Sequence, residues 1–221
     1  MNVNDMYRIC QFAINKAQNG YLTPAEFNLI INQAQISYQD YLLGEFQQYQ
    51  YGRAQARINY SQNENIRQRL SPLITEATLT INGTSGESPY PADYVQADTI
   101  ITTAFKRVRF VQQDSLYSYY NSEVDPIATN PIYLIEPSGF QFYPKTLGTA
   151  LLTYVKDAPT IVWAYTIVSG RPVYDSGASD QPVWADVDLL DIIARALKLV
   201  GVNLQAGQVE QYANQVTQQG Q

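Results

Sequence analysis

The sequence predicts an α+β fold, in which N- and C-terminal helices form an α-helical bundle and a central region is rich in antiparallel β-strands. Near both ends of the chain, apolar residues recur every three or four positions, which is the spacing of an amphipathic helix. In between, short β-branched and aromatic runs are separated by Gly, Pro and Asn, which is typical of antiparallel strands. We therefore expect an N-terminal helical region at residues 1–72, a β-rich region at 73–181 and C-terminal helices at 182–221 that complete the bundle.

Two helices are predicted at the start of the chain. The first begins at Asn4 or Asp5 and stops at Gly20, and its inner face is expected to hold Met6, Ile9, Phe12 or Ala13, and Ala17. The second follows Thr23-Pro24-Ala25-Glu26, a capping box with proline at the first helical position. Its apolar stripe comprises Phe27, Ile30, Ile31, Ala34, Tyr38, Tyr41 and Leu42. Residues 45–70 continue the helical region, with an interruption at Gly52 and an end at Ser71-Pro72.

The central region is predicted to contain short strands and one short helix. Pro137-Ser138-Gly139 separates two of the strands and indicates a hairpin. The short helix is capped by Asp114 and carries Leu116, Tyr117 and Tyr120. The candidate strands are residues 78–81, 99–103, 106–111, 132–135, 140–143, 149–155 and 161–166.

Helical spacing returns after Pro182. A helix over residues 186–200 is predicted to bury Leu189 or Leu190, Ile193, Ala196, Leu197 and Val200, and Gly201 ends it. A last helix is expected at residues 207–216. Because these helices and the first two all carry wide apolar stripes, we expect the four to pack as one bundle, which brings the ends of the chain together.

Composition narrows the classes of function. The chain of 221 residues contains one cysteine and no histidine, so no internal disulfide and no zinc or haem ligand set is expected, and no cofactor is predicted. Its apolar runs are too short to cross a bilayer. The formal charge of −6 disfavours a protein that coats nucleic acid. The 18 tyrosines are typical either of surfaces that meet another protein or of residues flanking a β-sheet core.

Several segments resemble ligand sites but have simpler explanations. Residues 15–26 can be aligned with a calcium-binding loop, but Ala17 occupies the third ligand position and Glu26 is the only carboxylate, so no calcium is expected there. The cluster of Asp186, Asp188 and Asp191 could bind magnesium, but carboxylates at a helix start are favoured by the helix dipole. Cys10 is expected to be buried and unreactive.

Two groups of cations are the candidates for contacting DNA or an acidic partner. A solvated face is the commoner explanation for both, because neither group shows interleaved base-stacking aromatic residues in a net basic setting. The first group lies in the segment that follows the second predicted helix, and the second lies in a predicted strand around Val108. Their members are Arg53, Arg57, Arg67 and Arg69, and Lys106, Arg107 and Arg109.

Four segments, in this order, carry a resemblance to a known family. Residues 19–28 with Gln33-Ala34-Gln35 resemble the opening of head-to-tail connector (neck, adaptor or ring) proteins of tailed phages, podovirus-type and crAss-like. Tyr90-Pro91-Ala92-Asp93-Tyr94 is similar to the entry to the family's β region. Residues 131–133, 139–144 and 151–159 resemble its consecutive strands, and residues 188–201 with Gln211-Tyr212-Ala213 resemble its closing helix pair.

The resemblance implies a structural virion protein without catalytic residues. Such a subunit forms a homo-oligomeric ring, a dodecamer like the portal it follows, assembled in the host cytoplasm and contacting the portal and other neck or tail proteins. Genomic DNA passes through the ring without sequence-specific binding, and no membrane is involved. Residues 45–70 and 169–180 are not placed by the resemblance and are expected to mark docking surfaces. The alternatives are another virion component, such as a tail-tube, baseplate or capsid-decorating protein, and a metal-dependent hydrolase or nuclease.

Overall fold

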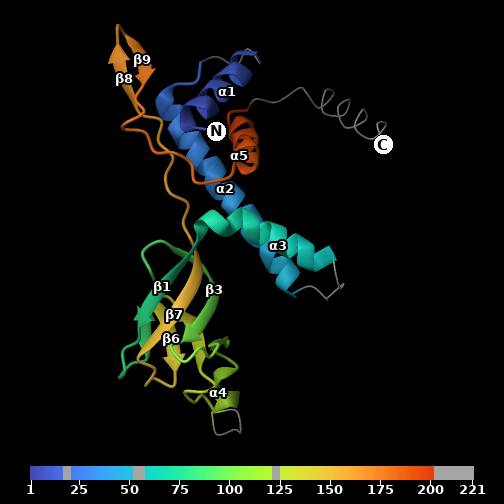
Figure 1. Ribbon diagram of the computed structural model, residues 1–221, viewed down its shortest axis with the longest axis vertical. Helices are drawn as coiled ribbons and strands as arrows, with labels where there is room; N and C mark the ends of the chain where they lie inside the picture. The colour runs from blue at the N-terminus through green and yellow to red at the C-terminus, as the bar shows by residue number, and fades with distance from the viewer. Residues whose placement is uncertain (17–20, 52–57, 121–124, 202–221) are drawn as a thin grey trace. The chain divides into compact units, whose positions relative to one another are not determined.

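The computed structural model describes residues 1–16, 21–51, 58–120 and 125–201, and it divides into two compact units (Figure 1). Unit 1 combines Met1–Pro72 with Ala158–Gln221, and unit 2 is Leu73–Asp157. Helices dominate the described part of unit 1 and strands dominate unit 2, so the predicted α+β class is confirmed. The predicted β-rich region extends to residue 181, whereas residues 158–181 belong to the helical unit.

Unit 1 is built on helices α1 (Val3–Lys16), α2 (Pro24–Tyr51), α3 (Ile58–Leu70) and α5 (Asp186–Leu199), and a short 3-10 helix, η1 (Ser71–Leu73), follows α3. Helix α5 contacts both α1 and α2, and α3 contacts α2 (Figure 1). Phe27, Ile31 and Ile193, from α2 and α5, are all buried. The helix predicted at residues 207–216 lies outside the described residues.

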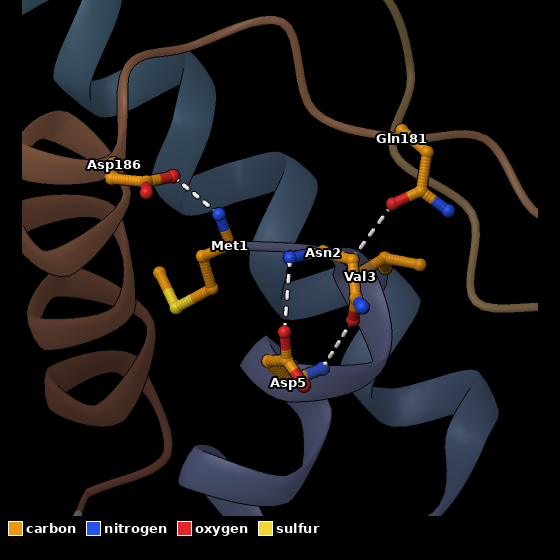
Figure 2. A network of polar contacts seen from close by, with 6 residues as sticks. All are labelled: Met1, Asn2, Val3, Asp5, Gln181 and Asp186. Carbon is orange, nitrogen blue, oxygen red and sulfur yellow. Dashed lines mark hydrogen bonds and ion pairs between the residues drawn. The ribbon is translucent and has the colours of Figure 1, made fainter.

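Helix α1 starts earlier than predicted and buries a different face. The Asn2 side chain accepts a hydrogen bond from Asp5 N at 2.8 Å, and the Asp5 carboxylate accepts one from Asn2 N at 3.2 Å (Figure 2). Asn2 is therefore the N-cap of α1, and the prediction that this helix begins at Asn4 or Asp5 is wrong. Ile9 and Phe12, predicted to face inward, are 38% and 67% exposed. The buried face instead comprises Val3, Met6, Tyr7, Cys10 and Ile14.

Helix α2 begins at the predicted capping box. Thr23 N and Thr23 Oγ1 donate to the Glu26 carboxylate at 2.8 and 2.7 Å, and Glu26 N donates back to Thr23 Oγ1 at 3.3 Å. These bonds satisfy two amides that the helix itself leaves open. Most of the predicted stripe is buried, but Tyr41 is 47% exposed. The buried members are Phe27, Ile31, Ala34, Tyr38 and Leu42.

The segment after unit 2 pairs with side chains of α2 rather than with a strand. Four side-chain amides recur at helical spacing on α2 and hydrogen-bond the backbone of residues 158–163. We call them the amide row: Asn28, Asn32, Gln35 and Gln39. Asn32 both donates to Ile161 O and accepts from Ile161 N, each at 2.8 Å. The strand predicted at residues 161–166 is therefore wrong over residues 161–164. Because the amides of α2 satisfy this backbone, β8 (Tyr165–Val168) begins only at Tyr165.

Strand β8 forms a hairpin with β9 (Arg171–Tyr174), which the sequence analysis did not predict. The two-residue turn places Ser169 and Gly170 at φ +52° and +77°. Positive φ at both positions matches a type I′ turn, whose twist suits a two-residue hairpin. Further along unit 1, α5 covers nearly all of the predicted helix, and Gly201 follows it at φ +69°.

Unit 2 contains two sheets packed face to face. The three-stranded sheet has the order β1 (Ile74–Thr80), β7 (Thr149–Lys156), β3 (Tyr94–Thr102), and both pairs are antiparallel. The four-stranded sheet has the order β2 (Glu87–Pro89), β6 (Gly139–Tyr143), β5 (Ile132–Glu136), β4 (Arg109–Phe110). Side chains from both sheets share one core, which includes Leu79, Ile100, Phe140, Phe142 and Leu152.

The hairpin predicted at Pro137-Ser138-Gly139 is present between β5 and β6. A Cβ at Gly139 would lie 2.1 Å from Ser88 O, so only glycine lets β2 lie this close to β6. The strand predicted over residues 106–111 is wrong in extent, since only β4 is a strand. The short helix α4 (Leu116–Tyr119) is present, with Ser115 rather than Asp114 at its N-terminal flank and with Tyr117 79% exposed.

Candidate interaction surfaces

The structure does not bring the first cation group together on one described surface. Arg53 and Arg57 lie outside the described residues, and Arg67 is exposed on α3. Arg69 lies instead against the neighbouring helices. Its guanidinium donates to Tyr38 Oη at 3.2 Å and lies 3.5 and 3.7 Å from carboxylate oxygens of Asp188 and Asp191.

Asp188 is the buried acceptor of this network. It is 2% exposed and accepts a 2.7 Å hydrogen bond from the Tyr38 hydroxyl, so α2, α3 and α5 are joined at one point. Burial, together with the hydrogen bond to Asp188, raises the pKa of Tyr38 above its ordinary value. Asp186 and Asp188 lie in the first turn of α5, where the helix dipole favours carboxylates as predicted, although the N-cap is Ala185 and no side chain makes a cap hydrogen bond. Asp186 pairs with the ammonium group of Met1 (Figure 2).

The second cation group forms an exposed surface on unit 2, the cationic loop, which comprises residues 103–110. Lys106, Arg107 and Arg109 are exposed, and Val108 between them is buried. Within the described residues, no carboxylate lies within salt-bridge distance of these three cations. Phe105 is 85% exposed and Phe110 is 47% exposed. The loop therefore offers positive charge and apolar rings side by side.

Backbone hydrogen bonds hold the cationic loop in shape. Phe105 N donates to Thr102 O at 2.9 Å, Thr102 N donates to Lys106 O at 2.8 Å, and Lys106 N donates to Thr102 Oγ1 at 3.1 Å. Val108 N donates to Ile100 O at 2.8 Å. Phe105 adopts φ +55°, a conformation that bulky residues rarely take. The sequence does not predict the positive φ of Phe105, because the turn contains neither Gly nor Asn.

A pocket of about 470 Å³ lies elsewhere on unit 2, and we call it the acidic pocket. Two carboxylate residues, Glu87 and Glu136, line it, and Phe140 contributes to its apolar wall. Ser88 is 1% exposed, and its Oγ has no hydrogen-bond partner among the described residues. The other lining residues are Thr80, Asn82, Ser85, Pro89, Ser138 and Gly139. None of these residues is predicted from the sequence to be functional.

The helices of unit 1 expose apolar side chains. Leu29 and Ile36 are 74% and 52% exposed, and their spacing of seven residues puts them on one face of α2. Val187 and Leu190 on α5 are 66% and 58% exposed and are three residues apart. With Phe12 on α1, the helices α1, α2 and α5 each have large apolar groups that face outward.

A second pocket, of about 740 Å³, lies beside the β8–β9 hairpin in unit 1. The ring of Trp163 stacks with those of Tyr165 and Tyr174 and also contacts Tyr7. Arg8 and Arg171 are among the lining residues. On the hairpin itself Ile167 is 72% exposed.

The described residues hold one cysteine and no cluster of metal ligands. Cys10 is 2% exposed, as predicted, and burial raises the pKa of its thiol to about 12. In residues 1–16, 21–51, 58–120 and 125–201, no group of three or more His, Cys, Asp or Glu side chains is placed to hold a metal ion. None of the helices in these ranges combines the length and the apolar character needed to cross a bilayer.

Neither a scan against protein-family models nor a search of curated proteins finds a match to this chain.

Proposed function

We propose that this chain is a structural virion protein that forms a connector ring between the portal and the tail of a tailed phage. The observation that carries the proposal is the outward apolar surface of unit 1, on α1, α2 and α5. Single exposed apolar residues are normal, but paired ones on several helices of one unit are typical of a surface covered by another protein. A subunit of a closed ring has two such contacts with its neighbours.

The order of the segments that resemble connector proteins supports the same proposal. Residues 19–35, which carry the first part of that resemblance, include the capping box of α2 and the beginning of its amide row. Residues 131–133, 139–144 and 151–159 overlap β5, β6 and β7 of unit 2. The proposal assigns the protein to the virion, as a non-enzymatic homo-oligomer beside the portal, with the genomic DNA passing through its ring.

Imaging of purified particles at subunit resolution tests the proposal. We expect the chain in a closed ring on the portal axis, with a copy number equal to the ring symmetry, twelve if it follows the portal. A location in the tail tube, the baseplate or on the capsid surface would contradict it and would indicate another virion component. A matched experiment on the purified protein compares Leu29→Asp and Ile36→Asp with the control Gln68→Asp at an exposed polar position of α3, and only the first two should show weaker assembly.

A further inference from the structure

The acidic pocket extends from one edge strand of each sheet of unit 2 to the β5–β6 hairpin, and the cationic loop lies at the other edge strand of each sheet. Thr80 of β1 and residues 87–89 of β2 line the pocket, and β1 and β2 are edge strands of the two sheets. The cationic loop connects β3 to β4, which are the opposite edge strands. A surface and its complement on opposite sides of one body cannot meet within a chain, but they can meet between successive copies.

The charges of the two surfaces are complementary. The loop has three exposed cations without a carboxylate partner among the described residues, and the pocket is lined by Glu87 and Glu136. The chain as a whole has a formal charge of −6, so a compact cationic surface stands out from the rest. Such a pairing directs two surfaces into one orientation and disfavours contact between like surfaces.

The pocket also has room for an apolar group. Ser88 contributes to its lining, and the Ser88 Oγ is buried without a hydrogen-bond partner among the described residues. The volume of about 470 Å³ with Phe140 in the wall accommodates an aromatic side chain.

Phe105 has the exposure and the fixed backbone expected of a residue that inserts into a pocket of a partner. Its side chain is 85% exposed and its backbone is held at φ +55° by the hydrogen bonds of the turn. A strained conformation that surrounding bonds maintain is often found at functional sites. Rigid aromatic residues next to arginine are the groups that contribute most to protein–protein contacts, because little conformational freedom is lost when they bind.

We propose that the cationic loop of one copy docks into the acidic pocket of the next copy, with Phe105 inserted and Lys106 and Arg107 facing Glu87 and Glu136. The proposal rests on the proposed function, in which copies stand side by side in a ring, and it names one contact between them. The contact is heterologous, so every copy supplies one loop and one pocket. Double-stranded DNA fits the loop less well, because its bases are stacked with each other and offer no face to Phe105.

Zero-length crosslinking of the full chain tests which surfaces meet. A carbodiimide joins a lysine amine to a carboxylate only when the two groups touch, and it traps weak contacts in concentrated solution. With equal amounts of ¹⁴N- and ¹⁵N-labelled protein, we expect a mixed-isotope peptide pair that joins Lys106 to Glu87 or Glu136. The absence of that pair would overturn the proposal, as would equal yields at the exposed carboxylates Glu76 and Asp114.

Charge reversal tests the pairing itself. Variant L carries Lys106→Glu and Arg107→Glu, and variant P carries Glu87→Lys and Glu136→Lys. By sedimentation velocity, each variant alone should associate at least about tenfold more weakly than the wild type, because like charges then face each other. A mixture of L and P restores opposite charges at every contact and should recover association. The control Glu76→Lys with Asp114→Lys should associate as the wild type does.

The outcomes separate this proposal from the proposed function. If L and P fail to rescue each other while the chain still occupies a ring on the portal axis, the docking contact is wrong and the connector function stands. If the rescue occurs but imaging places the chain elsewhere in the particle, the contact stands and the connector function is wrong. Loss of DNA binding in L without loss of self-association would overturn the docking contact in favour of a nucleic-acid surface.

Discussion

The two units are stabilised in different ways. In unit 1, polar side chains fix the packing of helices and extended chain, through the amide row of α2 and through the contact of Tyr38 and Arg69 with Asp188. In unit 2, backbone ladders set the register and aromatic rings fill the core, where Tyr90, Tyr94 and Phe140 contact one another at 4.7 to 5.4 Å between ring centres. Directional hydrogen bonds of polar side chains therefore determine the packing of unit 1. Strand pairing and the burial of apolar side chains determine the packing of unit 2.

The largest effect on stability is expected from a substitution in the core of unit 2. Phe142 is fully buried, so Phe142→Ala should lower the free energy of unfolding of unit 2 by about 3–5 kcal/mol through lost burial and the cavity left behind. Peptide-resolved hydrogen exchange over residues 132–156 measures this loss. Both tryptophans, Trp163 and Trp184, belong to unit 1, so their fluorescence reports that unit separately. An equal loss in the fluorescence transition would show that the units unfold as one.

The next effect tests the amide row of unit 1. Asn32→Leu keeps the volume but removes both bonds to Ile161, so its backbone amide and carbonyl lose their partners. We expect a loss of about 2–3 kcal/mol in the tryptophan-detected unfolding of unit 1. The exposed neighbour Gln33→Leu serves as the control and should change stability by less than about 0.5 kcal/mol. A similar cost for both variants would contradict the role given to the row.

Alkaline pH should weaken unit 2 through Tyr154. Burial, and then its hydrogen bond to Asp93, raise the pKa of Tyr154 to about 12, above the value of about 10 in an unfolded chain. Between these values the folded state binds the proton more tightly, so the stability is complete below about pH 10 and is lost as the pH rises toward 12. Tyr154→Phe should flatten this decline, measured by hydrogen exchange of β7. Tyr117→Phe, at an exposed position, should leave the decline unchanged.

The smallest expected effect concerns the start of α2. Thr23→Ala removes the hydroxyl of the capping box and should lower the stability of unit 1 by about 1 kcal/mol. Hydrogen bonds from Thr23 lower the pKa of Glu26, so this part of the stability is present above the ordinary glutamate pKa and is lost as the pH falls. Thr23→Ser should retain the effect. Unchanged acid sensitivity in Thr23→Ala would show that the box contributes nothing.

The sequence predicted the features that depend on local signals. The capping box at Thr23, the burial of Cys10, the turn before Gly139 and the helix that ends before Gly201 all follow from short-range rules. Prediction from the sequence was wrong where contacts with distant parts of the chain determine the local structure. The buried face of α1 does not include Phe12. The backbone near Ile161 hydrogen-bonds to side-chain amides of α2 and does not form a strand.

The candidate surfaces were predicted only in part. The cluster of Lys106, Arg107 and Arg109 was visible in the sequence because charge needs no folding to be counted. The acidic pocket was not, because Glu87 and Glu136 are far apart in the chain and come together only when β2 pairs with β6. Arg69 was grouped with the other arginines by proximity in sequence, whereas the structure turns it toward Asp188.

The amide row of α2 also fixes the length of the extended segment that it binds. From Asn28 to Gln39 a helix advances about 16 Å, at 1.5 Å per residue. From Trp163 back to Ala158 an extended chain covers about the same distance, at 3.3 Å per residue. The two periodicities match because each step of three or four helical residues meets about two extended ones. A single inserted residue between Pro159 and Trp163 would put the two repeats out of phase, so this connection should tolerate substitutions far better than changes in length.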